Sequence, residues 1–345
     1  MSKFPPRMIL IAVIAFLGAA AHAQLFNDEG GLSAPAAAST AVSGGGPYII
    51  VVSDFDRSVE FYNAVLDMEP ASGNLDNYVS NAAISTLYDA TDGEFRNANY
   101  SLPDTDLALE LIEWRGVPAP ASTGDRIYDA GSTKLLVFVK DMDVAIGAAL
   151  NNGGALLEPP GGPVSDGPFT AAVVTDPDGF YVELLEISPT PETRIEGNAI
   201  HGRLRLSVTD AEQTADFFRE VFGFEIPPVG EFSDDPLLGE MTGLGVARNR
   251  IAFTMIPGSN INLEVIEYVV DDRQRVRYRL PAPGSPVLRL LFDSLDELEA
   301  ALRRARFAGA TLADNNVEPV ALAENVLMIT LEEPNGLFLE LATGF

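Results

Sequence analysis

The sequence predicts an α+β fold made of two tandem copies of one module, because three sequence blocks occur twice in the same order. The two copies are offset by a nearly constant distance, and Asp54, for example, precedes Asp210 by 156 residues. Repetition of this kind indicates an internal duplication. The paired blocks are 49–70 with 203–227, 107–114 with 261–268, and 174–186 with 330–342.

Each copy opens with a strand followed by a helix. The runs 48–52 and 203–208 are β-branched or alternate between apolar and polar residues, which is typical of strands. Asp54 and Asp210 follow and are well placed as helix N-caps. Apolar residues then recur at helical spacing, which predicts an amphipathic helix that covers a sheet. They are Val59, Phe61, Tyr62, Val65 and Leu66 in the first copy, and Ala215, Phe217, Phe218 and Val221 in the second.

Each copy ends in a hairpin, at DPDG (176–179) and EPNG (333–336). Proline presets φ in such turns, and glycine accepts a left-handed conformation. A second strand–helix start lies at 134–150 in the first copy and at 287–305 in the second, so each module divides into two similar halves.

The first residues favour export. Lys3 and Arg7 give a basic start, residues 8–20 form an apolar run too short for a comfortable membrane span, and Ala21-His22-Ala23 fits a cleavage site. An exported protein of this kind resides in the periplasm or in the medium. The predicted segments are a signal peptide (1–23), a flexible Ala/Ser/Gly linker (24–46), module 1 (47–188) and module 2 (199–345).

Composition excludes several kinds of site and partner. The formal net charge of −28 disfavours nucleic acid and anionic membrane surfaces. No cysteine is present, which excludes disulfides, zinc–thiolate sites and iron–sulfur clusters. Once the signal peptide is removed, His201 is the single histidine, so no site can use two imidazoles of one chain. A small-molecule ligand is the expected partner, and a homodimer is left open.

These motifs together resemble those of a known family. A strand, the pattern D-x-x-x-S-x-x-F-Y from Asp54 to Tyr62, an LEL strand at 109–111, a second strand–helix, and DPDG-x-x-x-E-L ending at Leu184 are similar to the vicinal oxygen chelate superfamily, the glyoxalase, bleomycin resistance and extradiol dioxygenase group. The resemblance covers nearly all of 47–344. It implies two tandem glyoxalase-like modules, each of paired βαβββ units that form an open cup-shaped mixed sheet around a small-molecule site.

The resemblance also implies a divalent metal in each cup, but it places unsuitable residues at half of the ligand positions. Proline and valine side chains cannot coordinate a metal, and lysine or arginine puts positive charge where the ion would lie. Zinc, nickel and iron normally take imidazole ligands. We therefore assign no metal ligand; Glu110, Glu183, Glu264, Glu340 and His201 remain candidates for a divalent ion. The implied positions are Pro47, Glu110, Lys134 and Glu183 in module 1, and Arg203, Glu264, Val287 and Glu340 in module 2.

The remaining side chains suggest that a basic residue replaces the charge of the metal. Two carboxylates that face each other in a cup repel, and a cation between them removes that cost. We expect Glu110, Glu183 and Lys134 to converge in module 1, and Glu264, Glu340 and Arg203 to converge in module 2. For catalysis, Glu183 or Glu340 would act as base, with Lys134 or Arg203 stabilising negative charge. The expected substrate-binding residues are Glu110, Glu264, Trp114 and Tyr181.

Three classes of function are compatible with this sequence. The favoured one is an exported small-molecule binding protein with a degenerate metal site. The second is a metal-dependent lyase, isomerase or dioxygenase of the same group. The third is a non-catalytic structural or assembly protein whose cups are filled by side chains. Hydrolysis by a Ser-His-Asp triad is disfavoured, because no G-x-S-x-G motif is present.

Overall fold

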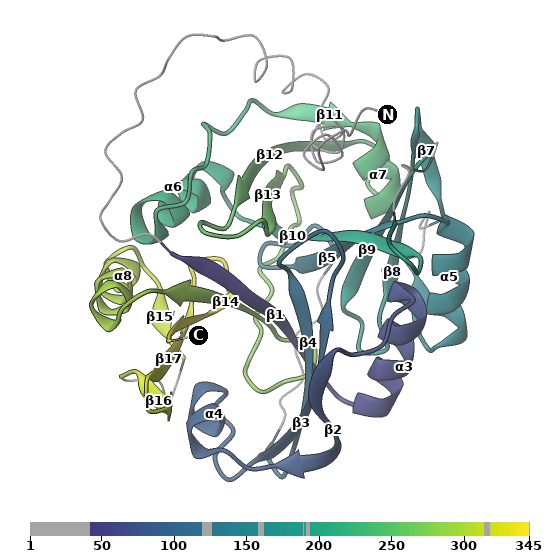
Figure 1. Cartoon of the computed structure of the whole chain (residues 1–345). Helices are drawn as coiled ribbons and strands as arrows, with labels where there is room; N and C mark the ends of the chain where they lie inside the picture. The colour runs from purple at the N-terminus through teal and green to yellow at the C-terminus, as the bar shows by residue number, and fades with distance from the viewer. Residues whose placement is uncertain are drawn as a thin grey trace, which may run out of the picture.

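The computed structural model describes residues 42–118, 126–157, 162–188, 190, 194–313 and 318–344, and within them one strand–helix–strands unit recurs four times (Figure 1). Units 1 and 2 form module 1, and units 3 and 4 form module 2. Unit 1 contains β1 (Gly44–Val52), α3 (Phe55–Leu66), β2 (Ser72–Val79), α4 (Ala82–Leu87), β3 (Glu94–Ser101) and β4 (Ala108–Arg115). Unit 2 contains β5 (Thr133–Val139), α5 (Met142–Asn151), β6 (Ala155–Leu156), β7 (Val164–Asp166), β8 (Phe169–Thr175) and β9 (Tyr181–Ile187).

Module 2 repeats this order. Unit 3 contains β10 (Ala199–Ser207), α6 (Ala211–Phe222), β11 (Ser233–Asp235), α7 (Pro236–Thr242), β12 (Ala247–Met255) and β13 (Asn262–Tyr268). Unit 4 contains β14 (Pro286–Phe292), α8 (Leu295–Phe307), β15 (Thr311–Leu312), β16 (Val320–Ala323), β17 (Val326–Glu332) and β18 (Phe338–Thr343).

The predicted helix N-caps are confirmed. The Asp54 carboxylate accepts from the Arg57 N–H at 3.2 Å, and that of Asp210 accepts from the Glu212 N–H at 2.9 Å. These bonds satisfy amide groups that a helix start leaves without an intrahelical partner. Asp141 and Ser294 occupy the same position in units 2 and 4.

A strand glutamate adds a second cap in the first three units. Glu113 accepts from the Phe55 N–H at 3.3 Å, Glu186 from Met142 at 2.7 Å, and Glu267 from Ala211 at 2.8 Å. Each of these glutamates follows another glutamate by three residues, and in a strand that spacing places the two side chains on opposite faces. One glutamate of each pair therefore caps the helix on the convex side, while the other faces the concave side of the sheet.

The strands form two mixed sheets, and each sheet takes one unit from each module. Within the described residues, sheet I has nine strands from units 1 and 4, joined where β1 pairs antiparallel with β14. Sheet II has nine strands from units 2 and 3, joined where β5 pairs antiparallel with β10. The predicted tandem glyoxalase-like fold with open mixed sheets is confirmed, and the pairing of strands runs across the modules.

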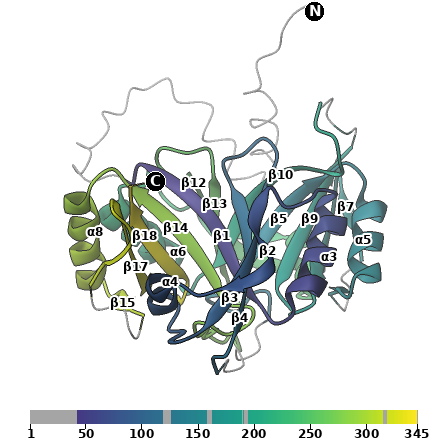
Figure 2. The same ribbon diagram turned by 60° about the horizontal axis from the view of Figure 1, so that its bottom comes forward.

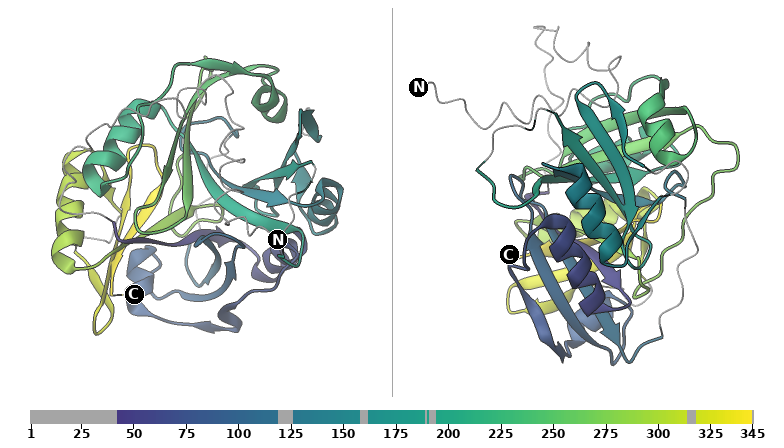
Figure 3. Two further views of the ribbon diagram at one scale, coloured as in Figure 1. Left: turned by 45° about the horizontal axis from the view of Figure 1, so that its top comes forward. Right: turned by 90° about the vertical axis from the view of Figure 1, so that its right-hand side faces the viewer.

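Helices, in contrast, pack within a module. Helix α3 contacts α5, and α6 contacts α8, on the sides of the sheets that face away from the cups (Figures 2 and 3). The hairpin turns also join the halves of a module: Asp178 accepts from the Ser53 N–H at 2.9 Å, and Asn335 from the Thr209 N–H at 3.0 Å. Both DPDG and EPNG are turns whose glycine has positive φ, as predicted.

The first strand begins earlier than predicted, inside the proposed linker. Strand β1 starts at Gly44, Val42 is buried, and the Ser43 N–H donates to the Leu291 carbonyl at 2.8 Å. A Cβ at Gly46 would lie 2.8 Å from Cδ of Arg289, so this glycine leaves room for the arginine side chain. The predicted signal peptide lies outside the described residues. Within the described ranges, no helix combines the length and apolarity needed to cross a membrane.

Cross-module strand pairing predicts that the modules unfold together. Trp114, the single tryptophan, lies on β4 of sheet I and reports on units 1 and 4. We expect its fluorescence transition in urea to coincide with the loss of far-ultraviolet circular dichroism, which reports on both sheets. Two separated transitions would contradict the shared sheets and favour independent modules.

Candidate functional site

The concave face of sheet II carries a row of buried charges. Strand alternation places the charged side chains on this face and directs Leu204 and Leu206 into the core on the other. The exposed fraction of each charged residue is between 0% and 4%. Its members, the sheet II ionic cluster, are Lys134 on β5, Glu183 on β9, Arg203 and Arg205 on β10, and Glu264 on β13.

Arg205 bridges the two carboxylates of this cluster. Its Nε donates to Glu264 Oε2 at 2.8 Å, and its Nη2 lies 2.7 Å from the same oxygen. Its Nη1 donates to Glu183 Oε2, while Arg203 Nη1 donates to Glu264 Oε1. Burial raises the pKa of Glu264, but Arg205 and Arg203 outweigh burial and hold that pKa below its usual value. One guanidinium therefore lies between a glutamate of module 1 and a glutamate of module 2.

Lys134 lies opposite Arg205 in the antiparallel pair of β5 with β10. Its Nζ donates to Ser207 Oγ at 2.5 Å and lies 6.0 Å from the centre of the Tyr268 ring. Lys134 is thus a buried member of the cup, and the bridging position between the carboxylates belongs to Arg205.

The cup of sheet I has a related arrangement. Arg289 Nε donates to Glu340 Oε2 at 2.5 Å, and Asn97 Nδ2 donates to Glu110 Oε1 at 2.7 Å. Burial raises the pKa of Glu110, and the positive charge of Arg289 and the Asn97 hydrogen bond offset only part of that rise. Arg289 interacts electrostatically with both carboxylates.

The expected convergence of two carboxylates within each module is wrong, because the sheets take their units from different modules. Glu183 shares a guanidinium with Glu264 in sheet II, and Glu340 shares a cup with Glu110 in sheet I. The predicted contact of Arg203 with Glu264 is present, and Lys134 lies in the same sheet as Glu183. The predicted places of Glu110 beside Glu183 and of Glu340 beside Glu264 are wrong, because they would require each module to close its own sheet.

Strand register shows how the cups correspond. Glu264 pairs with Arg205 in sheet II, whereas Glu110, at the equivalent position of sheet I, pairs with Ile49. Glu340 pairs with Arg289 in sheet I, whereas Glu183, at the equivalent position of sheet II, pairs with Leu136. Each cup therefore receives its bridging cation from a different strand.

Arg205 and Arg289 were missed by the sequence reasoning because each lies two residues beyond an implied ligand position, 203 or 287. Each is nevertheless a charged residue among leucines in a strand, RLRLS or VLRLLF. A charged residue between apolar residues of a buried strand is an available signal of a buried ion pair.

The other predicted residues lie in different surroundings. Trp114 packs against Tyr88 and Phe95 over sheet I, with ring centres 5.5 and 5.2 Å away. Tyr181 is buried in the apolar cluster of sheet II. His201 Nδ1 lies 3.1 Å from the Asp104 carbonyl oxygen, and burial followed by the charge of Arg203 lowers the pKa of His201 to about 4. The imidazole is therefore neutral at neutral pH.

The residues of both cups do not fit a divalent metal. Within the described part of the chain, no three His, Cys, Asp or Glu side chains are grouped so as to hold an ion. The carboxylates of Glu183, Glu264 and Glu340 are hydrogen-bonded to guanidinium groups. A metal would have to displace those arginines and would find no imidazole in their place.

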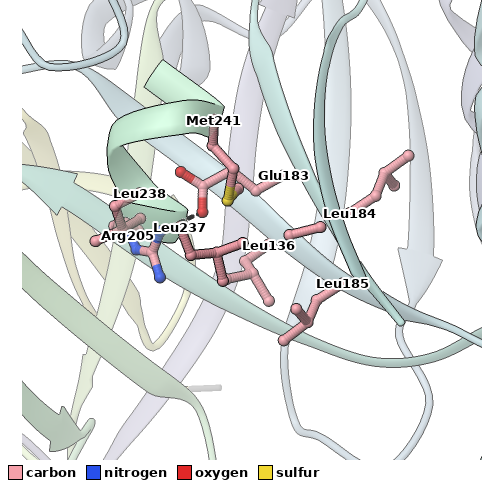
Figure 4. A pocket seen from close by; sticks show the side chains of 9 residues that line it. Leu136, Glu183, Leu184, Leu185, Arg205, Leu237, Leu238 and Met241 are labelled. Atoms are coloured by element: carbon pink, nitrogen blue, oxygen red, sulfur yellow. Dashed lines mark hydrogen bonds and ion pairs between the residues drawn. The ribbon is translucent and has the colours of Figure 1, made fainter. Parts of the chain in front are cut away.

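Helix α7 covers the sheet II ionic cluster. Figure 4 shows Glu183 and Arg205 directed toward one another, beside Leu237, Leu238 and Met241 of the helix. A cavity of about 20 Å³ remains between them, which is room for one water-sized group. Its lining consists of Leu136, Ala171, Glu183, Leu184, Leu185, Arg205, Leu237, Leu238 and Met241.

Several polar atoms of this cup have no hydrogen-bond partner among the described residues. They include Glu183 Oε1, Arg203 Nε and the Tyr268 hydroxyl, and all three are buried. Buried polar atoms are normally satisfied by protein, water or ligand. The arrangement can therefore accept a small polar group beside an apolar wall.

Comparison with known proteins gives a match over both modules. The model of the Glyoxalase/Bleomycin resistance protein/Dioxygenase superfamily matches residues 44–184 and 201–341. A probable lactoylglutathione lyase, chloroplastic, from Arabidopsis thaliana is 28% identical over 179 residues, 51% of this chain and 43% of that protein. A putative lactoylglutathione lyase from Brassica oleracea var. gemmifera is 25% identical over 179 residues, 51% of this chain and 53% of its own. The chain thus spans about half the length of the curated relatives it matches.

Solved structures show the same fold. Glyoxalase I from Zea mays superposes with a TM-score of 0.55 at 17% identity, over 88% of this chain and 92% of that one. A putative dioxygenase from Bacillus subtilis gives 0.53 at 14% identity, over 88% and 86%. At these identities the likeness concerns the fold alone.

Removal of the bridging cation tests the ionic cluster. We expect Arg205→Met to lower the free energy of unfolding by about 3–5 kcal/mol at about pH 7.5, because it leaves buried carboxylates without their shared cation. The loss should shrink at about pH 5, since a buried carboxylate without its cation takes up a proton more readily. Urea unfolding at both pH values measures the effect.

Two further variants act as controls. Arg248 is more than half exposed and pairs with Asp234, so Arg248→Met should cost at most about 1 kcal/mol. Adding Glu183→Gln to Arg205→Met should recover part of the stability. In the unaltered protein, the contribution of Glu264 is present above its unfolded pKa of about 4.3 and is lost as pH falls through its lower folded value. If Arg205→Met and Arg248→Met lowered the free energy of unfolding equally, the bridging role of Arg205 between Glu183 and Glu264 would be contradicted.

Proposed function

The chain belongs to the Glyoxalase/Bleomycin resistance protein/Dioxygenase superfamily, and we propose that it binds a small organic molecule in the cup of sheet II without a transition-metal ion. The observation that carries this proposal is the Arg205 guanidinium between Glu183 and Glu264. It places positive charge between the acidic side chains, where the family implies an ion.

A guanidinium group can supply some of the interactions that a metal ion would supply in this cup. It neutralises the facing carboxylates and offers fixed N–H donors, which suits recognition of a ligand oxygen. It has no open coordination position and does not generate hydroxide from bound water, as a catalytic metal ion does. The chemistry of this cup therefore supports binding over metal-assisted turnover.

A lyase is the second candidate, favoured by the relatives named as lactoylglutathione lyases. In that case Glu183 would be the base of sheet II, acting through Oε1, because its Oε2 accepts from Arg205.

The third class of function, a scaffold whose cup is filled by side chains, is supported by sheet I. There Val276, Tyr278 and Leu280, from the segment between units 3 and 4, pack with Ile49 and Val287 over the concave face. We therefore propose one ligand-binding cup, that of sheet II.

Metal content and ligand binding together test the proposal. Protein purified without chelator should contain far less than one equivalent of Zn, Ni, Fe or Mn by elemental analysis. A thermal-shift screen of metabolites should return compounds that raise Tm equally with and without EDTA. A stoichiometric metal, or ligand stabilisation that EDTA abolishes, would favour the metal-dependent lyase. Stabilisation by no compound of a broad library would favour the scaffold.

We also propose that the protein is exported, on the basis of the basic start, the apolar run and the Ala21-His22-Ala23 motif. Cleavage after Ala23 would give a mature chain that begins at Gln24. Intact-mass measurement of the protein secreted by its native host should match residues 24–345. A mass matching the full chain would contradict cleavage at this site.

A further inference from the structure

The DPDG turn buries a carboxyl group between the two halves of module 1. Asp176 is 2% exposed and lies where the hairpin of unit 2 meets the first strand and helix of unit 1. Its Oδ1 accepts from the Asp178 and Phe180 N–H groups at 2.9 and 2.8 Å, and its Oδ2 accepts from the Tyr62 hydroxyl of α3 at 3.1 Å. One side chain therefore shapes the turn and also fastens it to the helix of the other unit.

A second carboxyl group belongs to the same turn. Asp178 accepts from both the N–H and the hydroxyl of Ser53, the residue that follows β1. Within the described part of the chain, neither Asp176 nor Asp178 forms an ion pair. Arg57 of α3 donates to the Gly153 carbonyl oxygen at 3.2 Å instead. Two carboxyl groups thus lie close together without a cation between them, in contrast to the glutamates of sheet II.

Burial and like charge both favour a protonated carboxyl group at this position. Burial first, and then the charge of Asp178, raise the pKa of Asp176 to about 7, although its three hydrogen bonds favour the ionised form. Burial also raises the pKa of Tyr62 well above its usual value, so this phenol carries no charge in the same pH range. Tyr48 faces the turn from β1, with its ring centre 6.0 Å from that of Phe180, and donates its hydroxyl to Thr133.

Module 2 provides an internal comparison, because its EPNG turn lacks the second acid. Glu333 occupies the position of Asp176, and Asn335 occupies that of Asp178. The Asn335 Nδ2 donates to Glu333 Oε2 and to the Thr214 hydroxyl of α6, each at 3.0 Å. A neutral amide that donates to the buried acid therefore takes the place of a carboxylate that repels it. Repulsion between acids of the turn is thus a feature of module 1.

We infer that the DPDG turn is a proton-dependent latch that holds units 1 and 2 together. With one proton shared by Asp176 and Asp178, the turn stays docked on Tyr62 and Ser53. When that proton leaves, two neighbouring carboxylates repel each other in a place that water does not reach, and the turn loosens from unit 1. Strand β9 follows this turn and carries Glu183 of the sheet II ionic cluster, so the latch secures the start of a strand of the cup.

The variant Asp176→Asn tests the latch, because an amide has the shape of the protonated acid and cannot ionise. A buried acid with a raised pKa contributes stability that is present below its unfolded pKa of about 3.9 and is lost as the pH rises through its folded value. The Tm of the unaltered protein, relative to that of Asp176→Asn, should therefore fall by about 3 °C or more between about pH 5 and about pH 8. As a control, Asp166→Asn changes an exposed aspartate of the same unit, and its Tm should follow that of the unaltered protein.

Hydrogen–deuterium exchange of the unaltered full chain follows the latch directly. After correction for the intrinsic effect of pH, protection of the Asp178 and Phe180 amides should fall several-fold over the same pH range. Protection of the Asn335 and Leu337 amides in module 2 should change less. Asp178→Asn removes the repelling charge, so it should make the protection of the Phe180 amide less dependent on pH. Constant protection of the module 1 turn, or a Tm difference between Asp176→Asn and the unaltered protein that does not change with pH, would overturn the inference.

Discussion

The antiparallel pairing of β5 with β10 is the interaction on which the site depends. It joins a unit of module 1 to a unit of module 2 and places Lys134 opposite Arg205. The parallel neighbours on either side then bring Glu183 and Glu264 within reach of one guanidinium. A shift of this register by one residue would turn Arg205 toward the apolar helix layer, so the ionic cluster and the core enforce the same alignment.

Burying five charges in a sheet is acceptable only when each finds a partner. Desolvation opposes every member of the cluster, and mutual attraction repays it only where hydrogen-bond geometry is good. Arg205 meets that condition with Nε and Nη1, which donate to two different carboxylates. In sheet I, Arg289 achieves a similar result from another strand, in space left by Gly46. The two cups therefore contain different solutions to the same repulsion between glutamates.

Local features of the fold could be predicted from the sequence, because short-range rules determine them. The duplication, the caps at Asp54 and Asp210, the amphipathic helices and the two hairpin turns all follow from patterns within a few residues. The choice of sheet partner could not be predicted this way. Each unit presents the same strand edge, so pairing within a module or across modules satisfies the same local pattern. The sequence analysis placed Glu183 and Glu264 in separate cups, whereas they share Arg205 in sheet II, and it overlooked Arg205 and Arg289.

The pairing of β1 with β14 also makes sheet I depend on contact between distant parts of the chain. Ile49 pairs with Val287, a residue that leaves the ribosome much later. Until unit 4 emerges, β1 presents an unpaired edge of backbone N–H and C=O groups, which is a template for wrong association. Sheet II, whose units are consecutive in the chain, can close first and hold unit 1 in place through α3 and α5. Closing sheet I therefore joins strands that lie far apart in the chain, which costs more chain entropy than closing sheet II, whose paired strands are closer in sequence.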